Sequence, residues 1–109
     1  MIPADQEFQH RAEAALAALY DRLGQAADEF DFDVEMNSGA LTVEFDEPRE
    51  RFVVSPNSPV RQIWVSAHVH SFKLDWDAPR AAFVLPATGQ SLDQLIAGEI
   101  RQRLPGFHL

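Results

Sequence analysis

The sequence predicts an α+β fold, a two-layer α–β sandwich in which two helices pack on one face of an antiparallel sheet of about six strands. An apolar pattern with helical spacing opens the chain and a second one closes it. Between them, short stretches alternate between apolar and polar residues and are separated by turn residues, which favours an antiparallel meander. The chain has 109 residues, so we expect one domain spanning residues 1–109.

The first helix is predicted from apolar residues at spacings of three and four, namely Phe8, Ala12, Leu16, Leu19 and Leu23. Asp5 is a suitable residue to cap its start. The last helix is predicted to open at Ser91, because Ser91 and Gln94 have the spacing of a capping box. Its apolar stripe comprises Leu92, Leu95, Ile96, Ile100 and Leu104, and Pro105-Gly106 is expected to end it.

The central part of the chain supplies the predicted strands. Each alternating run is bounded by Pro, Gly, Asn or Asp, which are typical turn residues. The expected strands cover roughly residues 32–36, 40–46, 51–55, 61–67, 72–76 and 81–85.

The charge distribution limits the classes of partner. The net charge is −8, and residues 1–50 contain 13 acidic and three basic side chains, whereas residues 51–109 contain four acidic and six basic ones. Such a field repels nucleic acids and anionic membranes and attracts metal cations or basic protein surfaces. We therefore expect neither nucleic acid nor membrane among the partners.

The absence of cysteine excludes disulfides and thiolate metal sites. The first residues have no basic, apolar leader pattern and no stretch reaches the roughly 20 apolar residues of a membrane span, so a cytoplasmic location is the default expectation.

The stretch DEFDFDVE, residues 28–35, is the most unusual part of the sequence. In a strand, Asp31, Asp33 and Glu35 would lie on one face, with Phe32 and Val34 pointing toward a core. One interpretation is that the charges keep an edge strand from pairing with other molecules. The other is cation binding, which would be weak, because residues i and i+2 of a strand lie roughly 6.5–7 Å apart and one ion reaches at most two such carboxylates.

A second candidate surface lies in VRQIWVSA, residues 60–67. If Ile63 and Val65 face the core, then Gln62 and Trp64 face solvent, where an exposed tryptophan is suited to anchor a protein partner. The alternative is a bulge that shifts the alternation and buries Trp64.

Catalytic motifs are not found. The chain has no Gly-flanked nucleophilic serine, no phosphate-binding glycine loop and no His-Glu-x-x-His helix. His68 and His70 would share one strand face and are a candidate second metal site, although two solvated histidines at a strand end are the simpler interpretation. We expect a protein that is not an enzyme.

Several motifs in this order resemble the frataxin family, in particular its bacterial, CyaY-type members. They are the acidic hairpin DFDVEMNSGALTVEF, the strand SPVRQIWVSA, the pair Asp75-Trp76 and the helix start GQSLDQLI. The resemblance runs over nearly the whole chain. It implies the same sandwich and a bacterial, non-enzymatic protein of iron–sulfur cluster assembly. Such a protein binds iron weakly, as Fe2+ or Fe3+, and contacts cysteine desulfurase and the cluster scaffold protein. The resemblance also brings weak ferroxidase-like activity, an attribute of some family members, as an alternative that we do not favour.

The resemblance also implies roles for individual residues. The acidic residues that would bind iron, called the acidic ridge below, are Asp21, Asp28, Glu29, Asp31, Asp33 and Glu35. Gln62, Trp64 and Lys73 would contact partners. The chain departs from the family at Tyr20, Gly24, Gln25 and Ala27, where other members have acids, so fewer or weaker iron sites are expected.

Two hypotheses follow from these observations. In the first, the chain is an iron-binding regulator or iron donor for cluster assembly, a monomer that can oligomerise with iron. In the second, it is a protein-interaction module whose ridge docks on a basic partner, and its metal binding is incidental.

Overall fold

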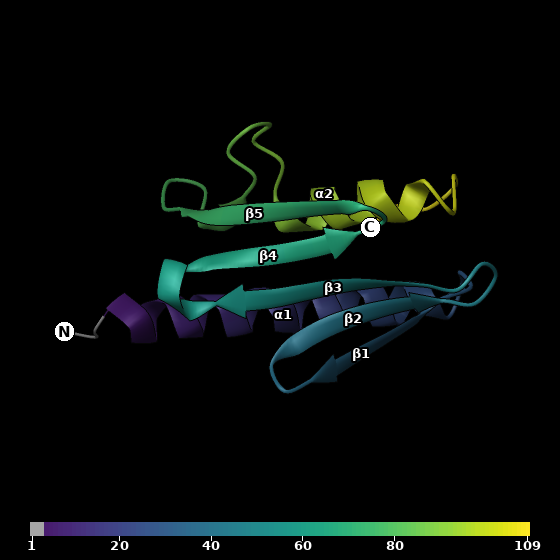
Figure 1. The fold of residues 1–109 in the computed structure, drawn as a ribbon, viewed down its shortest axis with the longest axis horizontal. Coiled ribbons are helices and arrows are strands. Elements are labelled where there is room, and N and C mark those ends of the chain that lie inside the picture. The colour runs from purple at the N-terminus through teal and green to yellow at the C-terminus, as the bar shows by residue number, and fades with distance from the viewer. Residues whose placement is uncertain (1–3) are drawn as a thin grey trace.

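The computed structural model describes residues 4–109 and confirms the predicted sandwich (Figure 1). Helix α1 (Ala4–Ala27) is followed by strands β1 (Asp33–Asn37), β2 (Ala40–Phe45) and β3 (Glu50–Asn57). A short 3-10 turn, η1 (Ser58–Val60), leads to β4 (Gln62–Ala67), β5 (His70–Asp77) and β6 (Ala82–Val84), and helix α2 (Leu92–Arg101) completes the fold.

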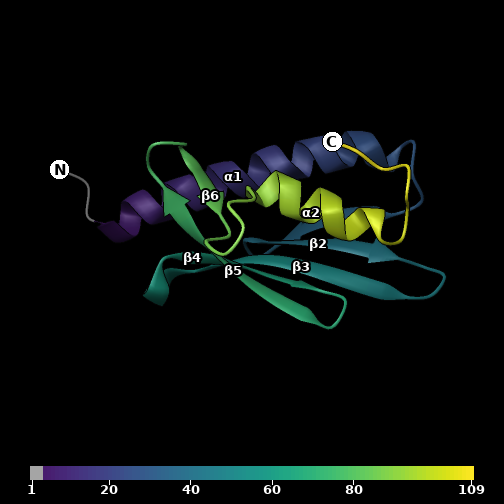
Figure 2. The same cartoon turned by 90° about the horizontal axis from the view of Figure 1, so that it is seen from above.

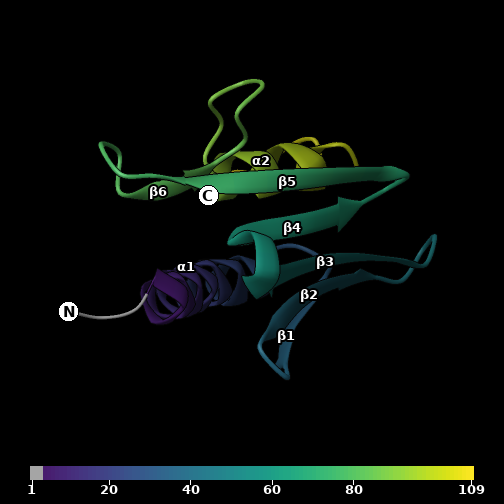
Figure 3. The ribbon, with the colours of Figure 1, turned by 60° about the vertical axis from the view of Figure 1, so that its left-hand side comes forward.

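The sheet is an antiparallel meander in which the spatial order of the six strands equals their order in the chain. Strands β1 and β6 are therefore its edges. Both helices lie on the same side of the sheet, and within residues 4–109 no helix covers the other side, called the open face below (Figure 2). The strands twist strongly, so that the β1–β2 hairpin turns away from the plane of β4 and β5 (Figure 3).

The core lies between the helices and the sheet. The five apolar residues predicted for the first helix are its buried residues, and the helix-facing side of the strands contributes Leu41, Val43, Phe52, Val54, Ile63, Val65 and Leu74. Because apolar residues alternate along each strand, burying this side exposes the intervening polar side chains on the open face. The alternation in the sequence thus determines which residues are available to partners.

Helix α2 begins as predicted. Ser91 is its N-cap, its side chain accepts a hydrogen bond from the Gln94 backbone N–H, and the Gln94 side chain accepts one from the Ser91 backbone N–H. The α2 helix ends at Arg101, earlier than predicted from Pro105-Gly106. Leu104 therefore lies beyond the helix, and its partly buried side chain packs against the core.

The prediction for Asp5 was wrong. Helix α1 already includes Ala4, so Asp5 lies in the first turn instead of capping it, and its carboxylate accepts a hydrogen bond from Arg61 at 3.2 Å. Carboxylates are favourable in the first turn of a helix as well as at its cap, so composition alone does not separate the two positions. No helix in the described part of the chain is long and apolar enough to cross a membrane.

Candidate functional site

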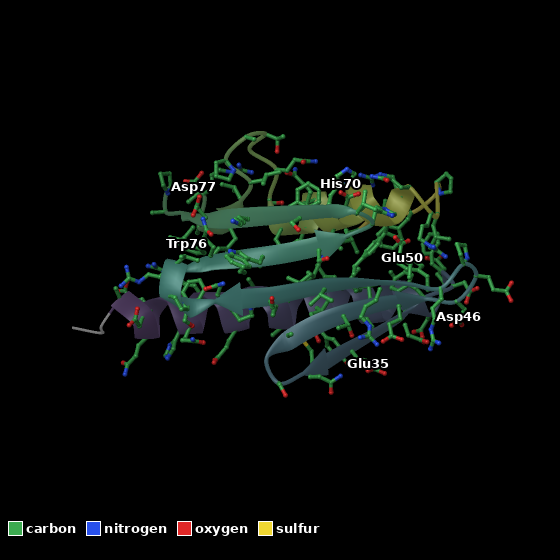
Figure 4. The ribbon with its side chains drawn as sticks, in the orientation of Figure 1. Glu35, Asp46, Glu50, His70, Trp76 and Asp77 are labelled. Atoms are coloured by element: carbon green, nitrogen blue, oxygen red, sulfur yellow. The ribbon has the colours of Figure 1, made fainter. Side chains whose placement is uncertain are left out.

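The acidic ridge runs from the second half of α1 through the following loop to the edge strand β1. All six of its residues are exposed. Phe32 is buried and Val34, which lies opposite Val43, is half-buried, so the alternation predicted from the sequence holds. Strand β1 begins only at Asp33, which leaves Asp31 in the preceding bend. Glu35 lies at the β1 edge of the molecule, far from Asp77 (Figure 4).

The ridge acids form no salt bridge in the described part of the chain. Among residues 4–109, none of the six forms an ion pair with Lys, Arg or His, whereas Glu7, Glu44, Glu50 and Asp93 all pair with arginines. Glu44 illustrates the difference, because it lies directly opposite Asp33 but is paired with Arg51 at 2.9 Å. The charge of the ridge is thus available to external cations.

The ridge does not converge on one point. Within the described part of the chain, no group of three or more His, Asp or Glu side chains is arranged to hold a metal ion. The residues therefore fit a tightly bound metal poorly, and they fit a loosely held, hydrated cation at a pair of carboxylates.

The open face carries the second candidate surface. Ile63 and Val65 are buried, while Trp64 retains 37% exposure, so Trp64 faces solvent and no bulge buries it. Lys73 lies directly opposite Trp64 on β5, and its ammonium group is 4.9 Å from the centre of the indole ring. This distance is typical of a cation–π contact.

A shallow depression of about 220 Å3 adjoins the Trp64 ring on the open face. Ser55, Ser66 and Ser71 line it, together with Val53, Phe72 and Lys73. The open face therefore offers one large aromatic side chain beside a mostly apolar hollow edged by serines, an arrangement suited to receive a side chain of a partner protein.

The two histidines do not form the predicted pair on one strand face. His68 lies in the turn between β4 and β5 with φ +55°, and only His70 lies in a strand. A two-residue turn of this kind prefers glycine where the chain has His68. The predicted arrangement fails because the chain reverses between the two residues, although their spacing in the sequence matches that of a strand face.

His68 instead belongs to a polar cluster that sequence analysis missed. Its Nδ1 atom is 2.9 Å from the Glu50 carboxylate, and its Nε2 atom is 3.2 Å from the Glu99 carbonyl oxygen. Arg103 donates to Glu50 at 3.0 Å, and the His68 ring packs edge-on against Phe52. The cluster joins β3, the β4–β5 turn and the end of α2, so its role is structural.

Asp75 is the other residue that sequence analysis did not place in a site. Gln62 donates a hydrogen bond to Asp75 at 3.0 Å, and Trp64 donates one to Gln62 at 2.9 Å. The signal that would have indicated Asp75 is the strand register, in which Gln62 and Asp75 lie directly opposite each other.

The fold and the two surfaces define a small α–β sandwich that offers partners an acidic edge and an open sheet face with one exposed tryptophan. A family model for a frataxin-like domain matches residues 2–106 of the chain. The chain therefore belongs to the frataxin-like family.

Individual relatives agree with this assignment. The iron–sulfur cluster assembly protein CyaY of Azotobacter vinelandii is 32% identical over 91 residues, which cover 78% of this chain and 82% of that protein. Mitochondrial frataxin of Caenorhabditis elegans is 30% identical over 107 residues, 94% of this chain and 79% of that protein. The solved structure of frataxin from Psychromonas ingrahamii superposes with a TM-score of 0.75 at 20% identity, covering 94% of this chain and 93% of that one, and so supports the fold.

Proposed function

We propose that this protein acts in iron–sulfur cluster assembly as a non-enzymatic interaction module. Its acidic ridge docks on a basic surface of cysteine desulfurase, its open face contacts the cluster scaffold protein, and iron is a weakly held cargo. The pathway is supported by relatives that are named as iron–sulfur cluster assembly proteins. The identity of the two partners is what the family resemblance implies, and what each surface can contact is inferred from its charge and geometry.

The observation that carries the proposal is that the ridge is exposed and lacks internal ion pairs, while no three of its acids converge. A spread-out row of carboxylates matches a spread-out basic surface, which can engage all of them at once. Neighbouring strand carboxylates lie roughly 6.5–7 Å apart, so a single ion engages at most two. The geometry therefore favours docking on a partner over tight metal binding.

Iron binding is the second function of the same ridge. Asp33 and Glu35 lie on one side of β1 and can share a hydrated ion, with water completing its coordination. Such a site is weak and exchanges rapidly, as expected for an iron donor or an iron-dependent regulator. Docking and iron binding then compete for the same carboxylates.

Charge reversal tests the docking role. The double variant Asp31→Lys, Asp33→Lys is expected to weaken binding to cysteine desulfurase at least tenfold in the presence of a chelator, because it replaces two attractive contacts by repulsive ones. Binding of the natural sequence is expected to weaken as salt is raised from 50 to 300 mM, whereas the residual binding of the variant depends less on salt. Calorimetry measures both constants.

A matched control has the same charge change away from the ridge. Glu7 and Asp77 lie at the start of α1 and at the end of β5, so Glu7→Lys, Asp77→Lys changes the net charge equally. If the control weakens binding as much as the ridge variant, only net charge matters and ridge docking is wrong. If the ridge variant binds like the natural sequence, docking through the ridge is also rejected.

The iron role is tested separately by titrating ferrous iron while recording amide spectra. Residues between 21 and 35 are expected to respond at millimolar iron. If none of them responds, the iron half of the proposal is wrong, and docking is unaffected.

A further inference from the structure

We propose that Asp75 is a positioning residue of the open face: its carboxylate orients the Gln62 amide and, through it, the indole ring of Trp64. The importance of this orientation for binding rests on the proposed function, in which Trp64 contacts a partner. The chain of contacts itself involves only this protein and can be tested without a partner.

Two hydrogen bonds link Trp64 and Gln62 on β4 to Asp75 on β5. Gln62 on β4 lies directly opposite Asp75 on β5, and its Nε2 atom donates to Asp75 Oδ1 at 3.0 Å. Trp64 lies two residues further along β4 on the same face, and its Nε1 atom donates to Gln62 Oε1 at 2.9 Å. Asp75 thus acts on the hydrogen bond of the Trp64 indole N–H through the Gln62 side chain.

The Asp75 carboxylate and the Trp64 indole N–H together allow only one orientation of the Gln62 side-chain amide. A carboxylate accepts hydrogen bonds and an indole N–H donates them, whereas an amide can do either, depending on how it is turned. Only when its nitrogen faces Asp75 and its oxygen faces Trp64 does Gln62 satisfy both neighbours. Asp75 therefore selects the amide orientation that presents an acceptor to the indole.

Asp75 has no competing ion pair. It is half-buried, and no Lys, Arg or His within residues 4–109 forms a salt bridge with it. Its charge balances no arginine, unlike that of Glu44 or Asp93. The contact with Gln62 is the side-chain interaction that the structure assigns to it.

Burial does not fix the Trp64 ring, because the residue is 37% exposed. The ring is held at its N–H edge by Gln62 and over one face by Lys73. An exposed side chain that must be ordered on binding weakens affinity by roughly two- to tenfold. Restraining the ring in advance therefore favours a partner that recognises this one orientation.

The test is the exchange of the Trp64 indole N–H with water, measured by NMR on the labelled protein. Its signal is distinguished from that of Trp76 by its absence in Trp64→Phe. Replacing Asp75 by leucine removes the acceptor, and we expect the indole proton to exchange roughly two- to tenfold faster. If the rate rises by less than about twofold, the lower end of the effect of one hydrogen bond, the proposal is wrong.

Two further variants separate positioning from general loss of structure. Asp75→Asn keeps a carbonyl acceptor at the same place and should restore the natural exchange rate. Asp77→Leu makes the same change on the same face of β5, at a residue that accepts no hydrogen bond from Gln62 within residues 4–109, and should leave the rate unchanged. Failure of the Asn rescue, or equal acceleration in Asp77→Leu, overturns the proposal.

Where Asp75→Leu does not fold, as judged by circular dichroism, Asp75→Ser makes the same test, because its hydroxyl is too short to reach Gln62. Failure of the proposed function is recognised independently. If Trp64→Ala binds the scaffold protein as tightly as the natural sequence, the partner role of the open face is wrong. The exchange experiment then still decides whether Asp75 positions the ring.

Discussion

Replacing His68 by alanine is expected to destabilise the fold by about 2–4 kcal/mol. The substitution removes the contact between Nδ1 and the Glu50 carboxylate at 2.9 Å, and a hydrogen bond to a charged group contributes about 1.5–3 kcal/mol. It also removes the edge-on packing on Phe52, whose ring centre is 4.9 Å away, and such aromatic pairs contribute about 0.5–1.5 kcal/mol.

Solvent does not greatly reduce these contributions. The side chains of His68 and Glu50 are 19% and 24% exposed, and that of Glu99 is only 7% exposed. Removing the ring leaves the Glu50 and Glu99 oxygens with fewer partners in a partly dry environment, which is costly. The loss should therefore exceed that of an ordinary surface substitution.

The backbone at His68 provides a second comparison. Its φ of +55° is strained for residues with a Cβ atom and easy for glycine. His68→Gly should thus be less destabilised than His68→Ala by about 1 kcal/mol, although it loses the same side-chain contacts.

Urea unfolding followed by circular dichroism measures these differences. In a thermal unfolding experiment, the melting temperature should fall by roughly 4–8 °C for each kcal/mol of lost stability in a domain of this size. His70→Ala is the matched control, because His70 lies in the same hairpin but is exposed, and it should change stability by no more than about 0.5 kcal/mol. If His68→Ala is as stable as the natural sequence, or if His70→Ala loses as much stability as His68→Ala, the His68 contacts do not stabilise the fold as proposed.

Three further predictions concern α2, the open face and the ridge. Ser91→Ala should cost about 1 kcal/mol in urea unfolding, because it removes one half of the capping box, and no loss would contradict the cap's role. Ile63→Ala should lower the free energy of unfolding by about 2–5 kcal/mol and Trp64→Ala by no more than about 1 kcal/mol, because only Ile63 is fully buried. Equal losses would contradict the assignment of the two residues to opposite faces of the sheet. Asp33→Asn combined with Glu35→Gln should leave stability within about 0.5 kcal/mol or raise it, because neither carboxylate forms an ion pair within residues 4–109 and a glutamine oxygen can still accept the Asn37 hydrogen bond, which is 3.3 Å long. A large loss would show that the ridge is structural.

Local patterns in the sequence predicted most of the fold. The apolar spacing of the first helix gave its buried residues, and the Ser91–Gln94 spacing gave the start of α2. Boundaries were predicted less well, as at Asp5, because they depend on hydrogen bonds that many residue types can make. Strands β3 and β5 extend beyond the predicted runs, to Asn57 and from His70, since pairing with β4 adds residues that lack alternation.

Only those features of the candidate site that depend on residues close together in the sequence were predicted. The alternation in DEFDFDVE placed Asp33 and Glu35 on the exposed side of one strand, and the structure agrees. Whether the acids converge could not be predicted, because convergence depends on the path of the loop before β1. The contacts of Asp75 with Gln62 and of His68 with Glu99 were also out of reach, since they join residues 13 and 31 positions apart through strand register and helix packing.

Co-purification from the native cell tests whether this protein acts in cluster assembly by docking through its acidic ridge. A tag on the chromosomal copy allows the protein to be recovered with its partners at natural abundance, and mass spectrometry identifies them. We expect cysteine desulfurase or the cluster scaffold protein to be recovered. Recovery of the desulfurase should fall for Asp31→Lys, Asp33→Lys but not for Glu7→Lys, Asp77→Lys. Recovery of neither protein with the natural sequence would contradict a role in cluster assembly through docking.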